Sequence, residues 1–185
     1  MEQFSAINDE HRDFIAKQHV FFTASAAASG RVNLSPKGLD TLRVLGEHAV
    51  CYLDLTGSGN ETAAHNRADG RLTMMFCAFN GPPLILRLYG RSRILPRGGE
   101  AYRTILTQHF NDEETLGARQ IVVLDVDMVQ TSCGYGVPAF EYKGERPALI
   151  NWAQTKGEDG LDEYRRAKNV QSIDGFRTGM FEDVD

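Results

Sequence analysis

The sequence contains few cysteines, and they follow no recognised pattern. Cys51, Cys77 and Cys133 are odd in number and far apart, which fits neither a disulfide framework nor a zinc motif. We therefore expect reduced thiols and a cytoplasmic protein. Cys133 has no evident His or Asp partner in the sequence, so a small buried thiol is favoured over a nucleophile.

Long hydrophobic runs are also missing. No run approaches the roughly 18–20 apolar residues of a transmembrane helix, and residues 1–18 lack the apolar stretch of a signal peptide. The five histidines show no metal-ligand spacing, and no paired-carboxylate or Gly-x-Ser-x-Gly motif is present. We expect no membrane partner and no metal, and no catalytic acid, base or nucleophile can be assigned.

Basic residues are outnumbered: 20 Lys and Arg stand against 25 Asp and Glu, a net charge of −5. Nucleic-acid binding usually requires a basic stripe, so this balance argues against that class of partner. A phosphate on a small cofactor needs only a local positive site, so cofactor binding stays open. With 185 residues and 42% hydrophobic content, the chain suits one domain.

What the sequence does contain is strand after strand with short connections. The alternation of Leu86 and Leu88 with Arg87 and Tyr89 is typical of a half-buried strand, and Gly90 marks a bulge or bend. Hairpin-length connections indicate an antiparallel barrel rather than a doubly wound sheet. Strands are predicted at 20–27, 31–35, 41–45, 49–55, 72–79, 84–95, 120–130 and 139–142, and helices at 8–18, 100–110, 147–155 and 161–168, with a short helix beginning near residue 60.

The glycine-rich stretch Gly57–Thr62 could hold a phosphate. It follows a predicted strand and opens a short helix, whose free backbone N–H groups and positive dipole end attract anions. Asn60 or Ser58 could cap this helix. It is neither a Walker A loop nor a dinucleotide fingerprint, and the same pattern also describes a plain glycine-rich turn with a cap.

Two further features carry polar groups that suit a cofactor. Ser35 and Lys37 end the second predicted strand, where a hydroxyl and an ammonium could contact a polyol chain and a phosphate; an exposed turn is the alternative. Arg87, Arg91 and Arg93 share one face of the 84–95 strand, and such a row also describes a solvated face.

The order of these elements resembles the pyridoxamine 5′-phosphate oxidase-like family of FMN-binding split barrels. The resemblance runs from about Val20 to Tyr142 and depends on the stretch Arg31–Gly38, on Val50–Asp54 leading into Gly57–Asn66, and on the strand Leu84–Gly90. Asn151-Trp152 and the segment from Lys168 to Gly175 resemble an uncharacterised branch of the same superfamily.

The resemblance implies a six-stranded antiparallel Greek-key split barrel over residues 1–145, mainly β with peripheral helices. Residues 146–185 would form a helical extension that packs on the barrel or on a partner subunit. It further implies a homodimer with FMN held between the subunits. The cofactor-binding residues would be Asn33, Ser35, Lys37, Gly59, Asn60, Thr62, Asn66 and Arg87.

The chain departs from the family at the phosphate cradle. The family's basic pair is replaced by Asn60-Glu61. The phosphate would therefore have to be neutralised by Lys37, by the helix start, or by an arginine such as Arg67 or Arg87. The family's C-terminal substrate motif has no counterpart beyond Arg177, so vitamin B6 oxidation is not assigned.

The function predicted on this basis is that of an FMN-dependent oxidoreductase, because a flavin needs mainly binding, orientation and electrostatic tuning from its protein. The alternatives are a reductase that uses the deazaflavin F420, and a non-catalytic flavin or haem binder in which His65 or His109 ligates the iron.

Lys37 gives the first test. Lys37→Ala should weaken FMN binding by the value of a charge-assisted hydrogen bond, about 1.5–3 kcal/mol. A titration of both proteins with FMN measures the difference. An unchanged affinity would place the phosphate away from Lys37.

Overall fold

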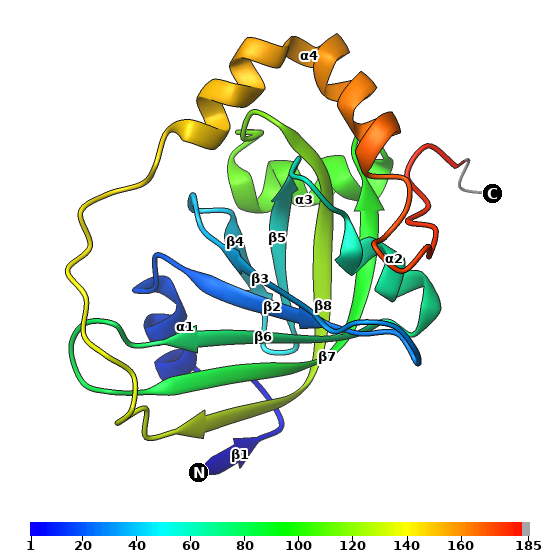
Figure 1. Ribbon diagram of the computed structural model, residues 1–185. Coiled ribbons are helices and arrows are strands. Elements are labelled where there is room, and N and C mark those ends of the chain that lie inside the picture. Colours follow the sequence, from blue (N-terminus) through cyan, green and yellow to red (C-terminus); the bar gives the residue numbers. More distant parts are fainter. Residues whose placement is uncertain (183–185) are drawn as a thin grey trace.

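A computed structural model describes residues 1–182 of the chain, and its sheet forms an antiparallel barrel (Figure 1). Seven strands follow one another in the order β3-β2-β6-β7-β8-β5-β4, and β1 pairs with β8. All neighbouring pairs are antiparallel. The strands are β1 (Glu2–Phe4), β2 (Phe21–Ser25), β3 (Asn33–Lys37), β4 (Leu42–Gly46), β5 (Ala49–Leu55), β6 (Arg71–Cys77), β7 (Ile85–Pro96) and β8 (Ala118–Ser132).

Four helices lie around this barrel: α1 (Asp9–Ala16), α2 (Glu61–Ala68), α3 (Glu100–Phe110) and α4 (Ala148–Lys168). None of the helices within residues 1–182 is long and apolar enough to span a membrane. Asn8 caps α1 by accepting a 2.8 Å hydrogen bond from the His11 backbone, and the His11 ring accepts one in return from the Asn8 backbone. In α4, Gly157 leaves the helical conformation with φ 64° and divides the helix in two.

The fold class predicted from the sequence is confirmed, with two corrections. The structure has eight strands rather than six. Seven of them form one continuous path, and β1 pairs with β8 beside this path. The long strands β7 and β8 pair with each other over the whole length of β7. The strand predicted at 139–142 is wrong: this segment is irregular and exposed, although the Phe140 backbone N–H donates to the Phe79 carbonyl at 2.8 Å. The two helical stretches predicted after residue 146 correspond to the halves of α4.

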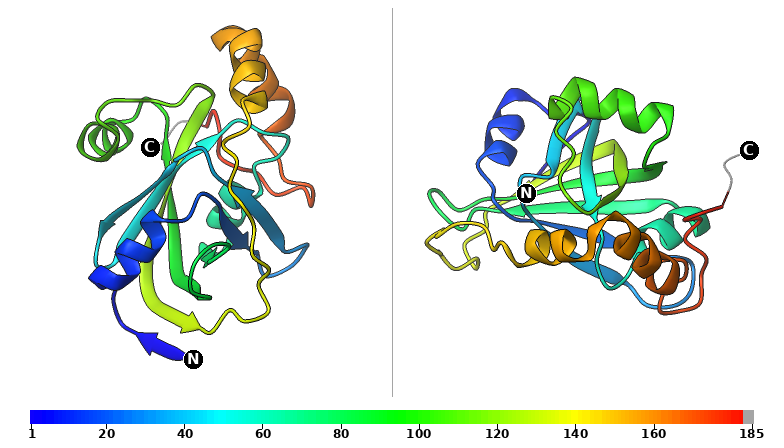
Figure 2. Two further views of the ribbon diagram at one scale, coloured as in Figure 1. Left: turned by 90° about the vertical axis from the view of Figure 1, so that its left-hand side faces the viewer. Right: turned by 90° about the horizontal axis from the view of Figure 1, so that it is seen from above.

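Alternating side chains of β5 and β8 divide the apolar residues into two groups. Val50 and Tyr52 of β5 point into the barrel, where they pack with residues of β6, β7 and β8. Cys51 and Leu53 point outward and pack against Tyr102 and Phe110 of α3, which covers the outer face of β4 and β5 (Figure 2). Successive side chains of a strand point to opposite faces, so β5 contributes both to the barrel interior and to the layer between the barrel and α3.

The residues after α4 return to the barrel and lie beside α2 (Figure 1). We call residues 169–182 the tail. Asn169 is completely buried, and Ser172 and Thr178 are nearly so. Burial of these polar side chains is tolerated because hydrogen bonds within the protein replace those to water. The tail is thus part of the packed structure around α2.

The bulge predicted at Gly90 is confirmed, and it explains why this position is glycine. The pairing of β7 with β8 shifts between Tyr89 and Gly90, which leaves Asp127 as an extra residue on β8. At this shift a Cβ on Gly90 would lie 1.9 Å from the carbonyl oxygen of Asp125. Only glycine lets the two backbones approach so closely.

Gly90→Ala should therefore destabilise the fold by about 1–3 kcal/mol, the usual cost of overpacking. Gly136→Ala is the matched control, since a Cβ added at Gly136 would meet no heavy atom within 4 Å. Urea unfolding of the three proteins measures the difference. Equal stabilities would show that the sheet opens at the bulge without cost.

Candidate functional site

Three of the predicted cofactor residues come together between β3 and α2. Asn33 and Ser35 alternate along β3 and so share one face. The Asn33 amide donates to the Thr62 hydroxyl at 3.3 Å and to the Ser25 hydroxyl at 3.2 Å, and the Ser35 hydroxyl donates to Asn33 at 3.0 Å. We call Ser25, Asn33, Ser35 and Thr62 the polar seam. Its bond between Asn33 and Thr62 joins β3 to α2 across 29 positions of the sequence.

Buried polar atoms without a partner lie next to the polar seam. Ser25 shares a 3.0 Å hydrogen bond with Nδ1 of His65, but Nε2 of His65 has no partner within residues 1–182. The same is true of the hydroxyls of Thr23 and Tyr52. Buried polar groups almost always have hydrogen-bond partners, so this cluster is suited to meeting a further polar group.

Lys37, at the end of β3, is held by a buried carboxylate. Its ammonium donates to Asp54 at 2.7 Å, and the other oxygen of Asp54 accepts from Arg119 at 2.9 Å and from Gln120 at 2.8 Å. The side chains of Asp54 and Arg119 are only 2% and 4% exposed, so both ions depend on each other for solvation. Burial by itself would raise the pKa of Asp54, but Arg119 and then Lys37 outweigh burial and hold this pKa well below its usual range.

Asn60, expected in the phosphate cradle, faces the interior instead. Its amide oxygen accepts from Gln120 at 2.9 Å, and its amide nitrogen donates to the backbone carbonyl of Asn169 at 3.3 Å. The Asn169 side chain in turn accepts from Arg119 at 2.8 Å and donates to the Gly57 carbonyl at 3.0 Å. We call Lys37, Asp54, Asn60, Arg119, Gln120 and Asn169 the Asp54 network; it ties the tail to the barrel.

The tail also contacts the outer end of α2 and the β2–β3 hairpin. Glu61, the first residue of α2, accepts a 3.1 Å hydrogen bond from the Ile173 backbone. Asp174 forms an ion pair with Arg31 and accepts a 2.6 Å hydrogen bond from the Arg31 backbone. Glu61 therefore already has a partner within the chain at the start of α2, where the family resemblance puts a phosphate.

A cavity of about 570 Å³ opens beside these contacts, between the hairpin, the start of α2 and the tail. We call it the hairpin cavity. Asn33 and Gly59, two of the predicted cofactor residues, both line it, together with Ser58 and Lys168. Lys168 forms no ion pair with any of residues 1–182, so its charge is free to meet an anion.

These residues fit FMN in part, and they relocate its phosphate. Hydroxyls and amides of the polar seam suit a ribityl chain and the polar edge of a flavin. The N-terminus of α2 does not suit a phosphate, because the Glu61 carboxylate lies there. Ser58 and Lys168 in the hairpin cavity offer a hydroxyl and a cation to a phosphate, beside Glu61, whose carboxylate lines the same cavity and accepts from the Ile173 backbone.

Four predicted cofactor residues lie outside the polar seam and the hairpin cavity: Lys37 and Asn60 belong to the Asp54 network, and Asn66 and Arg87 have other partners. The Asn66 amide donates to the hydroxyl of Ser92 on β7 at 3.0 Å, and Arg87 donates to Ser132 on β8 at 3.2 Å. Neither contacts the polar seam or lines the hairpin cavity. The expectation that Cys133 is buried is wrong, since this thiol is exposed, whereas Cys51 and Cys77 are buried.

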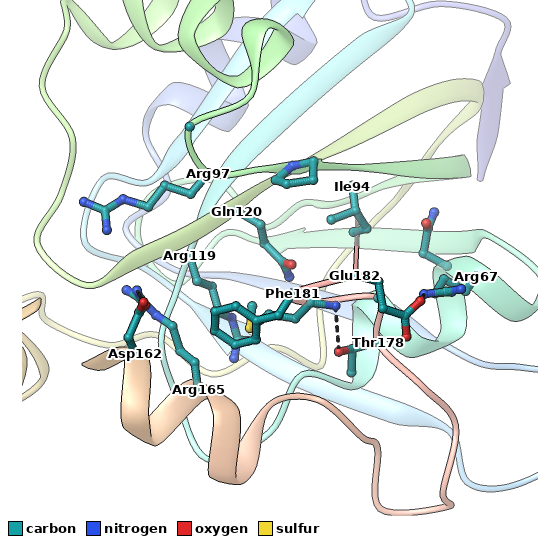
Figure 3. Close-up of a pocket in the computed structure, with 15 residues that line it drawn as sticks. Arg67, Ile94, Arg97, Arg119, Gln120, Asp162, Arg165, Thr178, Phe181 and Glu182 are labelled. Atoms are coloured by element: carbon teal, nitrogen blue, oxygen red, sulfur yellow. Dashed lines mark hydrogen bonds and ion pairs between the residues drawn. The ribbon is translucent and has the colours of Figure 1, made fainter. Parts of the chain in front are cut away.

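A second cavity of about 770 Å³ lies on the other side of α2, under the tail (Figure 3). Four arginines line it: Arg67, Arg97, Arg119 and Arg165. Each already has a carboxylate partner: Arg67 pairs with Glu182, Arg97 with Glu114 and Glu158, Arg119 with Asp54, and Arg165 with Asp162. The Arg67–Glu182 pair fastens the tail to α2, and the Arg97–Glu158 pair fastens α4 to the end of β7.

Arg119, Gln120 and Asn169 were missed by the sequence analysis. Arg119 and Gln120 begin β8, a strand recognised only by its apolar run, and Asn169 follows a helix in a polar segment. No local pattern marks them, because their partners lie 50 to 112 positions away.

The Asp54 network makes a prediction about stability. Asp54→Asn leaves Arg119 buried without a counter-charge and should cost about 3–5 kcal/mol. Asp125→Asn breaks the exposed pair with Arg93, whose side chains are 48% and 57% exposed, and should cost less than about 1 kcal/mol. Denaturant unfolding at pH 7 compares the two.

The pH dependence of stability tests the same contribution of the Asp54 charge in the wild-type protein. Because folding lowers the pKa of Asp54, its contribution is complete above the unfolded pKa of about 4 and is lost as pH falls toward the folded pKa. The wild-type stability should therefore fall below about pH 4, and the gap to Asp54→Asn should narrow. A gap that stays constant with pH would show that the charge of Asp54 is not what stabilises the fold.

Comparison with known proteins agrees with this architecture. Residues 7–133 match the family model described as pyridoxamine 5′-phosphate oxidase. The chain is 35% identical over 189 residues to the pyridoxamine 5′-phosphate oxidase family protein ustO of Aspergillus flavus, covering 94% of this chain and 76% of that protein.

Two solved structures share the fold at low sequence identity. HupZ of Group A Streptococcus aligns with a TM-score of 0.57 and 18% identity, covering 74% of this chain and 99% of that one. HutZ, the haem storage protein of Vibrio cholerae, aligns with a TM-score of 0.50 and 13% identity, covering 69% and 94%. The fold, the family model and the curated relative agree: the chain belongs to the pyridoxamine 5′-phosphate oxidase family.

Proposed function

We propose that this protein is an FMN-binding flavoprotein that acts as an oxidoreductase. The family contains FMN-binding and haem-binding members, so membership alone does not choose the cofactor. The observation that favours FMN is the hairpin cavity, which is lined by Asn33, Ser58, Gly59 and Lys168, and Lys168 has no carboxylate partner within residues 1–182. This donor set matches a polyol that ends in a phosphate, whereas haem would need an accessible axial ligand.

Neither His65 nor His109, the two histidines expected as iron ligands, supports haem. His65 is 1% exposed and lies behind the polar seam, so iron could reach it only after the tail has left α2. His109 lies on α3, where its backbone carbonyl accepts from Arg43 of β4, and it does not line the hairpin cavity. Haem is therefore an outcome of the test below and not a second proposal.

A homodimer would complete the site. Val32, Leu34 and Ile173 line the hairpin cavity and are 74%, 65% and 72% exposed. Apolar side chains gathered around a polar cavity are typical of a surface that another subunit covers. We propose that a second copy of this chain covers this rim and closes the cofactor site, and that the protein works in the cytoplasm, where its thiols stay reduced.

In this arrangement the bound flavin would supply the redox chemistry by accepting a hydride. The residues of this chain would bind and orient it. Asn33 and Ser35 would meet the polyol chain, Ser58 and Lys168 would hold the phosphate, and the Asp54 network would fix the strand end that carries Lys37. Tyr52 stays a neutral hydroxyl inside the barrel, because burial, and then the charge of Asp54, raises its pKa.

The test compares FMN with riboflavin, which lacks the phosphate. Wild-type protein should carry a flavin absorption spectrum or gain thermal stability with FMN. Lys168→Gln should weaken FMN binding about 10-fold or more, the value of one charge-assisted contact, and leave riboflavin binding unchanged. Lys156→Gln on the first half of α4 is the matched control and should change neither affinity.

Other results would decide against the proposal. A colourless protein without a thermal shift in FMN would refute it, and a Soret band after addition of haem would favour the haem-binding alternative. Tighter binding of F420 than of FMN would point to a deazaflavin reductase. Sedimentation of wild type and Leu34→Ser tests the dimer; a monomeric wild-type protein would remove the shared site.

A further inference from the structure

The largest cavity described lies away from the hairpin cavity. It has a volume of about 1010 Å³ and is enclosed by α1, by the turn that connects β6 to β7, and by residues 140–144. We call it the α1 cavity. Its lining is mainly apolar and rich in aromatic rings: Phe14, Val20, Phe79, Leu84, Phe140 and Tyr142.

The outer wall of the α1 cavity is an irregular segment. Residues 137–147 run along the outside of the barrel from β8 to α4 without regular structure (yellow in Figures 1 and 2). The Phe140 backbone is fixed to Phe79 by one 2.8 Å hydrogen bond, and the two rings lie 5.5 Å apart. Yet Phe140 and Tyr142 remain 61% and 49% exposed, although burial would be worth about 1.5–3 kcal/mol for such a side chain.

The cavity has one flat wall that suits a ring. The rings of His19 and Tyr142 are stacked, with centroids 3.6 Å apart and an angle of 5° between their planes. Charges at the rim nearly balance: Glu10, Asp13 and Glu141 stand against Lys17 and Lys143. The cavity therefore selects for flat apolar shape and against a high net charge.

We propose that the α1 cavity binds a small, planar, uncharged molecule with fused or linked rings. Its volume lies at the upper end of the range for small-molecule sites, roughly 300–1,000 Å³. Residues 140–144 form its outer side. The inference uses no residue of the hairpin cavity and does not depend on flavin binding.

The experiment uses the full chain and the uncharged two-ring probe N-phenyl-1-naphthylamine, which fluoresces in apolar surroundings. Its fluorescence should rise to saturation at about one probe per chain, as expected for a single enclosed site. Phe140→Ser should weaken probe binding about 10-fold. Tyr135→Ser is the matched control, since Tyr135 is 82% exposed on the same connection and does not line the cavity.

Both substituted side chains are exposed, so neither change opens the core, and equal melting temperatures will confirm intact folds. A signal that does not saturate, or equal weakening by both variants, would show unspecific adsorption and overturn the proposal. Displacement of the probe by FMN would assign the cavity to the flavin site instead. Conversion of a dimer to a monomer by Phe140→Ser would show that a second copy covers this face, which also overturns it.

Discussion

The arrangement around α2 depends on one buried charge. Asp54 is almost fully removed from water, and a carboxylate is tolerated there because Lys37, Arg119 and Gln120 together satisfy it. These partners come from the end of β3 and the start of β8, so the charge fixes how three strands meet. Arg119 also donates a hydrogen bond to Asn169, the first residue of the tail, and so connects the tail to Asp54. Removing the carboxylate would release all of these elements at once.

The tail explains why this chain departs from the expected phosphate cradle. A carboxylate at the first position of a helix is favourable, because it faces the positive end of the helix dipole. Glu61 has this position in α2 and also accepts the Ile173 backbone N–H. One side chain thus stabilises the helix and holds the tail, which a basic residue at this place could not do.

Buried polar groups and apolar cavities divide the molecule into regions of different character. The Asp54 network is built from hydrogen-bonded side chains with specific partners, and such networks fix one conformation when every member is satisfied. The region around α1 is enclosed by aromatic contacts and a single backbone hydrogen bond, which tolerate more variation in position. A rigid polar centre and an adaptable apolar margin are compatible in one barrel because the continuous core of β5 to β8 separates them.

The sequence alone determined the sheet, because alternation and short turns act over a few residues. It predicted the strands that became β2 and β3, the helix at 100–110, and the bulge or bend at Gly90. It missed β1, whose three residues carry no pattern of their own, and it predicted a strand at 139–142 where β-prone residues find no partner strand. Only the tertiary structure decided that Asn60 faces Asn169 and that Lys37 meets Asp54, because hydrogen bonds between residues 17 to 109 positions apart leave no periodic trace in a sequence. Local physics therefore set the elements, while the position of each functional side chain was set by the partners that folding brought to it.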